Sequence, residues 1–426
     1  MHIFFSGIGG TGIGPLALIA KQAGYQVSGS DKQRSGYTDY LIKHGVDNIH
    51  IGQTVEQIQR VHDKKAIDWL VHSSAVSGDH AELRFAKQYG IKISKRDELL
   101  NKIIEDKGLK LIAVAGTHGK TTTTAMVIWL FKQLGVPISY SVGAKISFGE
   151  MGEFDEKSKY FVYEADEYDR NFLTFKPHLS LITGIDWDHP DIYPTKSEYN
   201  SAFRQFLDQS NYAYIWDDDA AKLDLDESSA KLGIIHKTDH PEFSLPGEVN
   251  REDSALAAQG VLEVLDNTNI SKLASIANKF PGVSRRFERI AKNIYSDYAH
   301  TPDKIRGALQ LAKEVNPDNV IVVYEGLHNT RQHFIKNELA NLFTGVKKLY
   351  IVPSYRARED ESLEDLTPEK LKALIHEPRD TETARLDQTL HEKIQTHADA
   401  NDLVLCLSAG GGNSLDEWLR KQFEKN

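Results

Sequence analysis

A loop of small residues with one lysine follows the apolar stretch Leu111–Ala115 and leads into a run of good helix formers. Its residues are Gly116, Thr117, His118, Gly119, Lys120, Thr121 and Thr122. Backbone N–H groups of such a loop point at anions, and the helix N-terminus adds positive potential. Lys120 is then placed to reach the β- and γ-phosphates, and Thr121 to ligate Mg²⁺. Val114 replaces the first glycine of the full phosphate-loop pattern, but the strand-to-helix context still predicts an ATP-binding loop.

A second glycine loop, Gly7-Ile8-Gly9-Gly10-Thr11-Gly12, separates the first expected strand from the first helix, and Asp31 closes the second strand. This pattern is typical of dinucleotide binding, although the same turn can hold any diphosphate. A dehydrogenase needs no second phosphate loop, so we expect a nucleotide-linked substrate; a turn used only for packing is the alternative. The substrate-binding residues predicted here are Gly9, Gly10, Thr11, Gly12, Asp31, Ser73 and Ser74.

Acidic residues follow two further expected strands. Glu164-Ala165-Asp166-Glu167-Tyr168-Asp169 comes after one strand, and Asp186-Trp187-Asp188-His189 comes after the next. Hard cations prefer oxygen ligands, and the carboxyl ends of neighbouring parallel strands meet at one edge of a sheet. The sequence therefore predicts Mg²⁺ beside the phosphate loop, with carboxylates of these stretches and an imidazole as candidate ligands. A solvated acidic face is the alternative.

Charged residues also follow the strands expected in the last third of the chain. Arg285-Arg286-Phe287-Glu288 lies at an expected domain boundary, and Asp297-Tyr298-Ala299-His300-Thr301-Pro302 follows the next strand. His328 and Arg331 are placed similarly after Val320–Tyr324. An arginine at such a loop can stabilise a transferring phosphoryl group, and an aspartate can bind ribose hydroxyls. From the residues alone, either cluster is explained equally well by a functional site or by charged residues that pair at the protein surface.

The elements that position these residues alternate between apolar strands and helices, which predicts an α/β fold with parallel sheets. Breakers near Glu105–Gly108 and Phe280–Ser284 divide the 426 residues into three expected domains. They are an N-terminal Rossmann-like domain over 1–106, a central phosphate-loop domain with a parallel sheet over 107–284, and a C-terminal Rossmann-like domain over 285–426.

The composition narrows the class of protein. Hydrophobic residues make up 40% and charged residues 26%, as in ordinary globular domains. The net charge of −10 argues against nonspecific nucleic-acid binding, which normally requires a basic surplus. Cys406 is the only cysteine, and no apolar run is long enough to span a membrane. We therefore expect a cytoplasmic protein with neither a nucleic-acid nor a membrane partner.

Taken together, these motifs resemble the Mur ligase family over nearly the whole chain. The residues that carry the resemblance are Gly7–Gly10, Val27–Asp31, Gly116–Thr124, Glu164–Asp169, Asp188-His189, Pro246-Gly247, Arg285–Glu288 and Asp297–Pro302. The family implies three successive domains, for a UDP-sugar, for ATP and for an incoming amino acid. It also implies that ATP and Mg²⁺ are the cofactors, and that the product is a new amide formed through an acyl phosphate.

The resemblance assigns roles to individual residues. Lys120, His189, Arg286 and His300 are implied as catalytic residues, with Lys120 stabilising the transferring phosphate. Asn250 is implied at the adenine, Asp297 at the ribose and Arg286 at the phosphates of ATP. Domain closure would bring Tyr298, His300, His328 and Arg331 to the amino acid and would exclude water from the acyl phosphate. Thr121, Glu164 and His189 are implied as the Mg²⁺ ligands, and Glu167 and Asp169 join the predicted substrate-binding residues.

Two subfamilies share the N-terminal glycine loop: one adds L-alanine to UDP-N-acetylmuramate, and the other attaches a ready-made tripeptide. The tyrosine in Glu164–Asp169 is similar to the tripeptide subfamily, but the compact spacing up to Asp188-His189 favours the alanine subfamily. The loops at His300-Thr301-Pro302 and His328–Arg331 depart from the family pattern. A nucleotide-binding protein without turnover, or a nicotinamide dehydrogenase, remains as an alternative. We expect a monomer or a homodimer.

Overall fold

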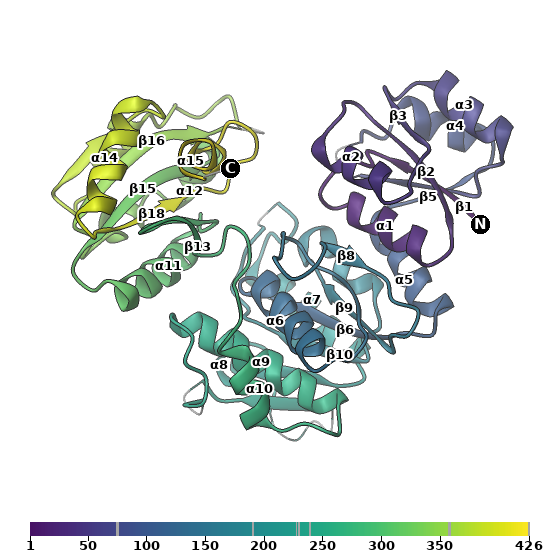
Figure 1. Cartoon of the computed structure of the whole chain (residues 1–426), viewed down its shortest axis with the longest axis horizontal. Coiled ribbons are helices and arrows are strands. Elements are labelled where there is room, and N and C mark those ends of the chain that lie inside the picture. The colour runs from purple at the N-terminus through teal and green to yellow at the C-terminus, as the bar shows by residue number, and fades with distance from the viewer. Residues whose placement is uncertain are drawn as a thin grey trace. The chain divides into compact units, whose positions relative to one another are not determined.

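The computed structural model describes residues 1–73, 76–189, 191–226, 228, 231–237, 240–356 and 359–424. Its strands form three sheets with helices around them (Figure 1). By their contacts, the residues group into two compact units. The first is Met1–Glu242 with Asp253–Phe280, and the second is Phe243–Glu252 with Pro281–Asn426. The expected α/β class with three parallel-dominated sheets is confirmed.

The first sheet is entirely parallel, with the order β3-β2-β1-β4-β5. Its strands are β1 His2–Ser6, β2 Gln26–Asp31, β3 Ile49–Ile51, β4 Trp69–His72 and β5 Lys92–Ser94. Its helices are α1 Gly14–Gln22, α2 Gly36–Lys43, α3 Val55–Lys64, α4 Ala81–Gln88 and α5 Arg96–Asp106. β1 is buried along its whole length, as expected for a central parallel strand covered on both faces. The glycine loop follows β1 and leads into α1.

The central sheet has the order β12-β11-β10-β6-β9-β7-β8, and only β8 runs antiparallel to its neighbour. Its strands are β6 Lys110–Ala115, β7 Ser139–Ser141, β8 Gly152–Glu153, β9 Tyr160–Glu164, β10 Leu179–Ile182, β11 Ala213–Trp216 and β12 Leu232–Ile235. Its helices are α6 Lys120–Gln133, α7 Lys196–Gln209, α8 Asp217–Lys222, α9 Glu248–Val264 and α10 Ile270–Ala277, with a 3₁₀ segment, η1, at Tyr168–Thr174. Because β6 lies between β9 and β10, the loops that follow these three strands meet at one edge.

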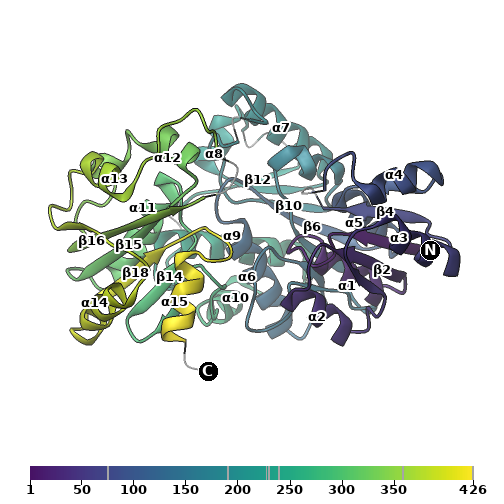
Figure 2. The ribbon, with the colours of Figure 1, turned by 90° about the horizontal axis from the view of Figure 1, so that it is seen from above.

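The third sheet has the order β13-β14-β18-β15-β16-β17, with β13 antiparallel. Its strands are β13 Glu288–Ala291, β14 Ile294–Asp297, β15 Val320–Leu327, β16 Lys348–Tyr355, β17 Thr381–Thr383 and β18 Leu403–Leu407. Its helices are α11 Pro302–Val315, α12 Asn329–Ile335, α13 Pro368–Leu374, α14 Gln388–Asp399 and α15 Leu415–Phe423, with the 3₁₀ turn η2 at Leu339–Asn341. Figure 2 shows α14 and α15 against this sheet. Separate apolar clusters fill its two faces.

The segment Phe243–Glu252 groups with the second unit, although the sequence placed it in the central domain. Arg251 explains this assignment, since its guanidinium binds both carboxylate oxygens of Glu314 in α11, at 2.9 and 3.0 Å. Gly247 adds a backbone N–H bond of 2.8 Å to the same carboxylate. The boundaries at 106/107 and 284/285 stay predictions.

Cys406 lies within β18 and is fully buried, and burial raises the pKa of its thiol. Among the described residues, no helix is long and apolar enough to cross a membrane.

Candidate active site at the edge of the central sheet

The predicted phosphate loop follows β6 and ends where α6 begins. The Lys120 ammonium lies 2.6 Å from Oε2 of Glu167 and 2.5 Å from the carbonyl oxygen of Gly116. The other carboxylate oxygen of Glu167 lies 3.8 Å from Nε2 of His189. Three side chains that the sequence placed after three different strands are therefore in contact.

The Glu167–Lys120 ion pair is largely shielded from water, since the side chain of Glu167 is 1% exposed and that of Lys120 is 15% exposed. Burial on its own lowers the pKa of the Lys120 ammonium. The negative charges of Glu167, Asp166 and Glu164 outweigh this effect and raise the pKa above its usual value. Lys120 therefore stays protonated and offers a fixed positive charge at the carboxyl edge of the sheet.

Thr121 and Glu164 form the second expected pair. The Thr121 hydroxyl donates to Oε1 of Glu164 at 2.8 Å, and the backbone N–H of Gly143 donates to Oε2 at 2.7 Å. Two oxygen ligands, one from the residue after the loop lysine and one from the end of β9, are thus held together, and such ligands suit a hard cation. No group of three or more His, Cys, Asp or Glu side chains in the described part of the chain is arranged to hold a metal ion.

Three residues at this site have a strained backbone. Asp169, Arg170 and His189 have positive φ angles of 54°, 56° and 58°, which are uncommon for residues other than glycine. The Tyr193 hydroxyl donates to the carbonyl of Glu167 at 2.6 Å, and the Arg170 guanidinium lies 5.2 Å from the Tyr193 ring. Strained positions persist where the surroundings fix them, and they cluster at functional sites.

Gly119 is required at the turn into α6. Its φ of 75° is left-handed, and a Cβ atom there would stand 2.5 Å from Oδ1 of Asp253. That oxygen accepts a hydrogen bond of 2.9 Å from the Thr123 hydroxyl. Gly119 also provides no side-chain cap, so the first amides of α6 have no competing internal acceptor.

Sequence reasoning missed the residues that brace this loop. The Thr117 hydroxyl lies 2.7 Å from both the carbonyl of Asp186 and the hydroxyl of Tyr199, and Nε2 of His118 lies 3.6 Å from the Asp186 carboxylate. Lys222 binds the other oxygen of that carboxylate at 3.0 Å. Tyr199 and Lys222 are far from the loop in sequence and carry no local motif.

The N-terminal glycine loop has a different arrangement. Oδ2 of Asp31 accepts a hydrogen bond of 2.8 Å from the backbone N–H of Gly9, and the N–H of Gly10 is bound to the carbonyl of Gly7. The backbone N–H of Ser73 donates to the carbonyl of Ser6. Asp31 and Ser73 therefore lie at the predicted loop, while Ser74 is outside the described residues.

In the second unit, Asp297 organises the turn after β14. Its carboxylate oxygens accept the backbone N–H groups of Phe287 and Ala299, each at 2.7 Å. Burial raises the pKa of Asp297, although the nearby arginines and these hydrogen bonds oppose the shift. The guanidinium groups of Arg285 and Arg286 each lie 4.7 Å from the ring of Tyr298, and His300 packs edge-on against that ring. Arg286, Asp297, Tyr298 and His300 thus form one cluster.

The other residues expected in this unit lie elsewhere on it. Asn250 donates to the carbonyl of Pro246 at 2.8 Å within its own helix turn. His328 precedes α12 with a positive φ of 54°, and its N–H donates to the carbonyl of Tyr355. Arg331 lies one turn further along α12. That Asn250, Arg286 and Asp297 share one nucleotide with the phosphate loop stays a prediction.

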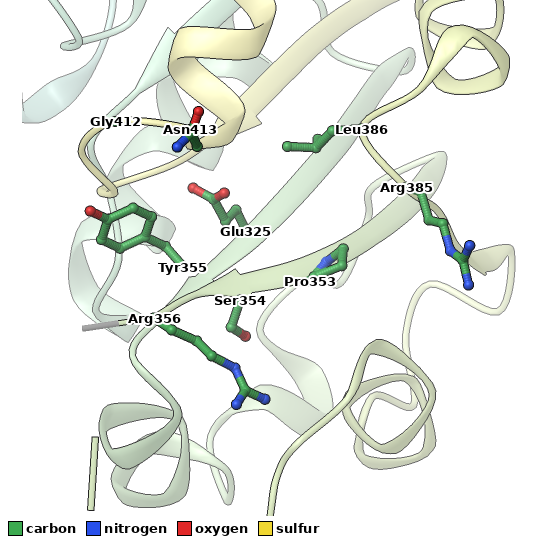
Figure 3. A pocket seen from close by; sticks show the side chains of 9 residues that line it. All are labelled: Glu325, Pro353, Ser354, Tyr355, Arg356, Arg385, Leu386, Gly412 and Asn413. Carbon is green, nitrogen blue, oxygen red and sulfur yellow. The ribbon is translucent and has the colours of Figure 1, made fainter. Parts of the chain in front are cut away.

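A cavity of about 440 Å³ opens at the carboxyl ends of β15, β16, β17 and β18 (Figure 3). Its lining residues are Glu325, Pro353, Ser354, Tyr355, Arg356, Arg385, Leu386, Gly412 and Asn413. Glu325 is buried and accepts hydrogen bonds from the Ser408 hydroxyl at 2.6 Å and the Leu415 N–H at 2.9 Å. Burial still raises the pKa of Glu325. None of the nine was among the expected site residues.

The sequence matches three family models in the expected order. They are described as the Mur ligase family catalytic domain over residues 2–107, the Mur ligase middle domain over 114–245, and the Mur ligase glutamate ligase domain over 285–410. A UDP-N-acetylmuramate–L-alanine ligase of Syntrophomonas wolfei is 30% identical over 84% of this chain and 83% of the relative. One of Carboxydothermus hydrogenoformans is 30% identical over 97% and 95% of the two chains.

Solved structures agree with these matches. The UDP-N-acetylmuramate–alanine ligase of Thermotoga maritima superposes with a TM-score of 0.74, at 25% identity over 99% of this chain and 98% of that one. A murein peptide ligase of Psychrobacter arcticus shares the fold, with a TM-score of 0.63 at 21% identity over 96% of each chain. The order of the domain matches, the full-length relatives and the shared architecture lead to one conclusion: this chain belongs to the Mur ligase family.

Proposed function

We propose that this protein joins L-alanine to UDP-N-acetylmuramate in an ATP-dependent reaction of peptidoglycan synthesis. The observation that carries the proposal is the contact between Lys120, Glu167 and His189 beside the Thr121–Glu164 pair, in a chain of this family. A fixed cation and two oxygen donors next to a phosphate loop suit transfer of a terminal phosphoryl group. The many relatives named as alanine-adding ligases support the choice of substrates.

The proposed chemistry has two steps. A carboxylate oxygen of the UDP-sugar attacks the γ-phosphorus of ATP, and the bond from that phosphorus to the ADP oxygen breaks. The amine nitrogen then attacks the carbonyl carbon of the acyl phosphate, inorganic phosphate leaves, and the nitrogen loses a proton. Lys120 stabilises the charge that develops on the transferring group, while the first amides of α6 orient it.

Mg²⁺ is part of this proposal, and the oxygen atoms of Thr121 and Glu164 are the donors that would hold it. Bound there, the cation would neutralise charge on the phosphate oxygens. The roles of the other predicted nucleotide contacts follow from the same assignment: Asn250 at the adenine, Asp297 at the ribose and Arg286 at the phosphates.

The cavity of the second unit is the proposed site of the incoming amino acid. It lies at the carboxyl ends of parallel strands, where ligands of open α/β sheets bind. Arg356 and Arg385 offer positive charge for a carboxylate, and Glu325 and Asn413 offer oxygen acceptors for an ammonium group. Tyr298, His300, His328 and Arg331 remain predicted contributors from neighbouring loops of this unit. We place the reaction in the cytoplasm, where the single buried cysteine is compatible with reducing conditions.

The test is ADP release measured with ATP, Mg²⁺, UDP-N-acetylmuramate and one amine at a time: L-alanine, glycine, L-serine or an L-alanine-initiated tripeptide. The proposal expects release that requires both acceptor substrates and is fastest with L-alanine. Preference for the tripeptide would assign the chain to peptide recycling instead. ATP binding without any acceptor-dependent release would refute ligase activity.

A further inference from the structure

The first residue of α5, Arg96, lies beside the N-terminal glycine loop, 84 positions after Gly12 in the sequence. A Cβ atom built on Gly12 would stand 2.7 Å from Nη1 of Arg96, so the guanidinium fills the space that a side chain at position 12 would need. No sequence motif links Arg96 to Gly12.

Both residues adjacent to Arg96 are held by the central domain. The Tyr163 hydroxyl donates to Oδ1 of Asp97 at 2.7 Å, and the ammonium of Lys95 forms an ion pair with Asp169. Asp97 is almost fully buried. The start of α5 is therefore fixed on the acidic loop that contains Glu167, and Arg96 is directed from that fixed point to the glycine loop.

The guanidinium has charge partners but no hydrogen bond to any described residue. Its Nε lies 3.6 Å from Oδ1 of Asp97, and Nη2 lies 3.7 Å from Oδ2 of Asp166; both distances exceed a hydrogen bond. The side chain is one third exposed, at 33%. An arginine presents five donors in a planar fork that matches phosphate oxygens, so this fork retains its capacity to bind an anion.

The glycine loop also needs such a cation. The Asp31 carboxylate already accepts the hydrogen bond of the Gly9 N–H and brings a negative charge to the loop. Asp97 and Asp166 add two more carboxylates around Arg96, which itself lies beside Gly12, so backbone dipoles alone would meet a diphosphate in a negative environment. Arg96 is the positive group that the structure places between these carboxylates and Gly12.

We propose that Arg96 is a substrate-binding residue whose guanidinium donates to the diphosphate of the UDP-sugar on the glycine loop. The inference rests on the proposed function and deepens it by naming the side chain that neutralises this part of the substrate. Because Arg96 also lies 3.7 Å from Asp166, next to Glu167, it links the sugar-nucleotide loop to the loop that holds Lys120.

The test is isothermal titration of the full-length protein with UDP-N-acetylmuramate and with UDP-N-acetylglucosamine, which shares the diphosphate but lacks the lactyl carboxylate. We expect Arg96→Gln to weaken both ligands by the same factor, about 10- to 100-fold, and to reduce the salt dependence of their binding. Arg96→Lys should fall between wild type and Arg96→Gln, because it keeps the charge and loses the fork. Arg84→Gln, an exposed arginine of the same domain, is the matched control.

An ATP affinity of Arg96→Gln within twofold of wild type would show that this variant is folded. The conservative variant Arg96→Lys provides a second, independent measurement of the same contact. Unchanged affinity for both UDP-sugars would overturn the proposal. A loss confined to UDP-N-acetylmuramate would also overturn it, because it would place the contact at the carboxylate. Failure of the proposed function is separate: a wild type that binds UDP-N-acetylglucosamine but shows no acceptor-dependent ADP release refutes the function, while the effect of Arg96→Gln is still measured.

Discussion

Glu167 holds the phosphate-loop lysine: its Oε2 lies 2.6 Å from Nζ of Lys120, and both side chains are largely shielded from water. The position that this carboxylate oxygen takes beside the Lys120 ammonium would also suit an oxygen of a terminal phosphate. The carboxylate therefore stabilises the charged lysine, and under the proposed function it would compete with ATP for that lysine. Two predictions depend on this contact.

The first prediction concerns removal of the Lys120 ammonium group. Lys120→Ala should reduce the rate of acceptor-dependent ADP release by about 10²- to 10³-fold, because a preorganised donor to the transferring group is lost. Lys132→Ala is the control, since Lys132 lies on the same helix and binds Glu153 instead. Full activity of Lys120→Ala in the coupled ADP assay would contradict the proposed chemistry.

The second prediction concerns the competing carboxylate. Glu167→Gln should lower the melting temperature of the nucleotide-free protein, at a cost of about 1–3 kcal/mol in the free energy of unfolding, because Lys120 loses its charged partner. The same substitution should tighten ATP binding by about tenfold, since no carboxylate remains to be displaced. Calorimetry and thermal melts with and without ATP measure both effects. Weaker ATP binding in this variant would show that Glu167 assists the nucleotide rather than competing with it.

A third prediction tests the cation site. Glu164→Gln should raise the Mg²⁺ concentration needed for half-maximal ADP release by about 10- to 100-fold, because a neutral amide is a poorer ligand for a hard cation. Mg²⁺ titration at saturating ATP measures the shift. Glu153→Gln, at the end of β8 in the same sheet, is the control. An identical Mg²⁺ dependence in wild type and Glu164→Gln would exclude Glu164 from the cation site.

The turn into α6 gives a fourth prediction. Gly119→Ala should weaken ATP binding by more than tenfold and destabilise the protein by about 1–3 kcal/mol, since it combines a left-handed φ with a contact against Asp253. Gly36→Ala is the matched control, because a Cβ atom built on Gly36 meets nothing within 4 Å and the φ angle of Gly36 lies outside the left-handed region. Equal ATP affinity and stability in the two variants would contradict the role assigned to Gly119.

Glu325 gives a pH-dependent prediction. Burial raises the folded-state pKa of this carboxyl, so the folded protein binds more protons than the unfolded chain, and its contribution to stability falls as pH rises from the unfolded pKa through the folded one. Glu325→Gln removes this dependence. Its melting temperature relative to wild type should therefore increase as pH rises from about 5 to 8. A difference that is constant with pH would show that the carboxyl titrates normally.

Much of the fold and of the phosphate site was predictable because the signals are local. Lys120, Thr121 and Glu164 each follow a strongly apolar strand, so their meeting at one edge follows from parallel topology. Two weak strands, β3 and β12, had no predicted counterpart, because β3 has three residues and β12 is only partly buried, so neither has a clear apolar pattern.

The remaining site residues could not be predicted because they depend on tertiary contacts. Arg96 reaches Gly12 only because Asp97 and Lys95 fix α5 on the central domain, and no spacing encodes that docking. Tyr199 and Lys222 brace the loop from distant helices. The cavity around Glu325 is formed by four strand ends whose adjacency comes from the sheet order β18-β15-β16-β17, which a sequence pattern does not reveal.

The burial of Cys406 has a practical consequence. A thiol inside β18 with a raised pKa presents almost no thiolate to a maleimide reagent, so the native protein should remain unlabelled. Cysteines introduced at exposed positions of the two units can then be modified selectively without first removing the natural one. Pairs of fluorophores attached in this way would test the domain closure that the family resemblance implies.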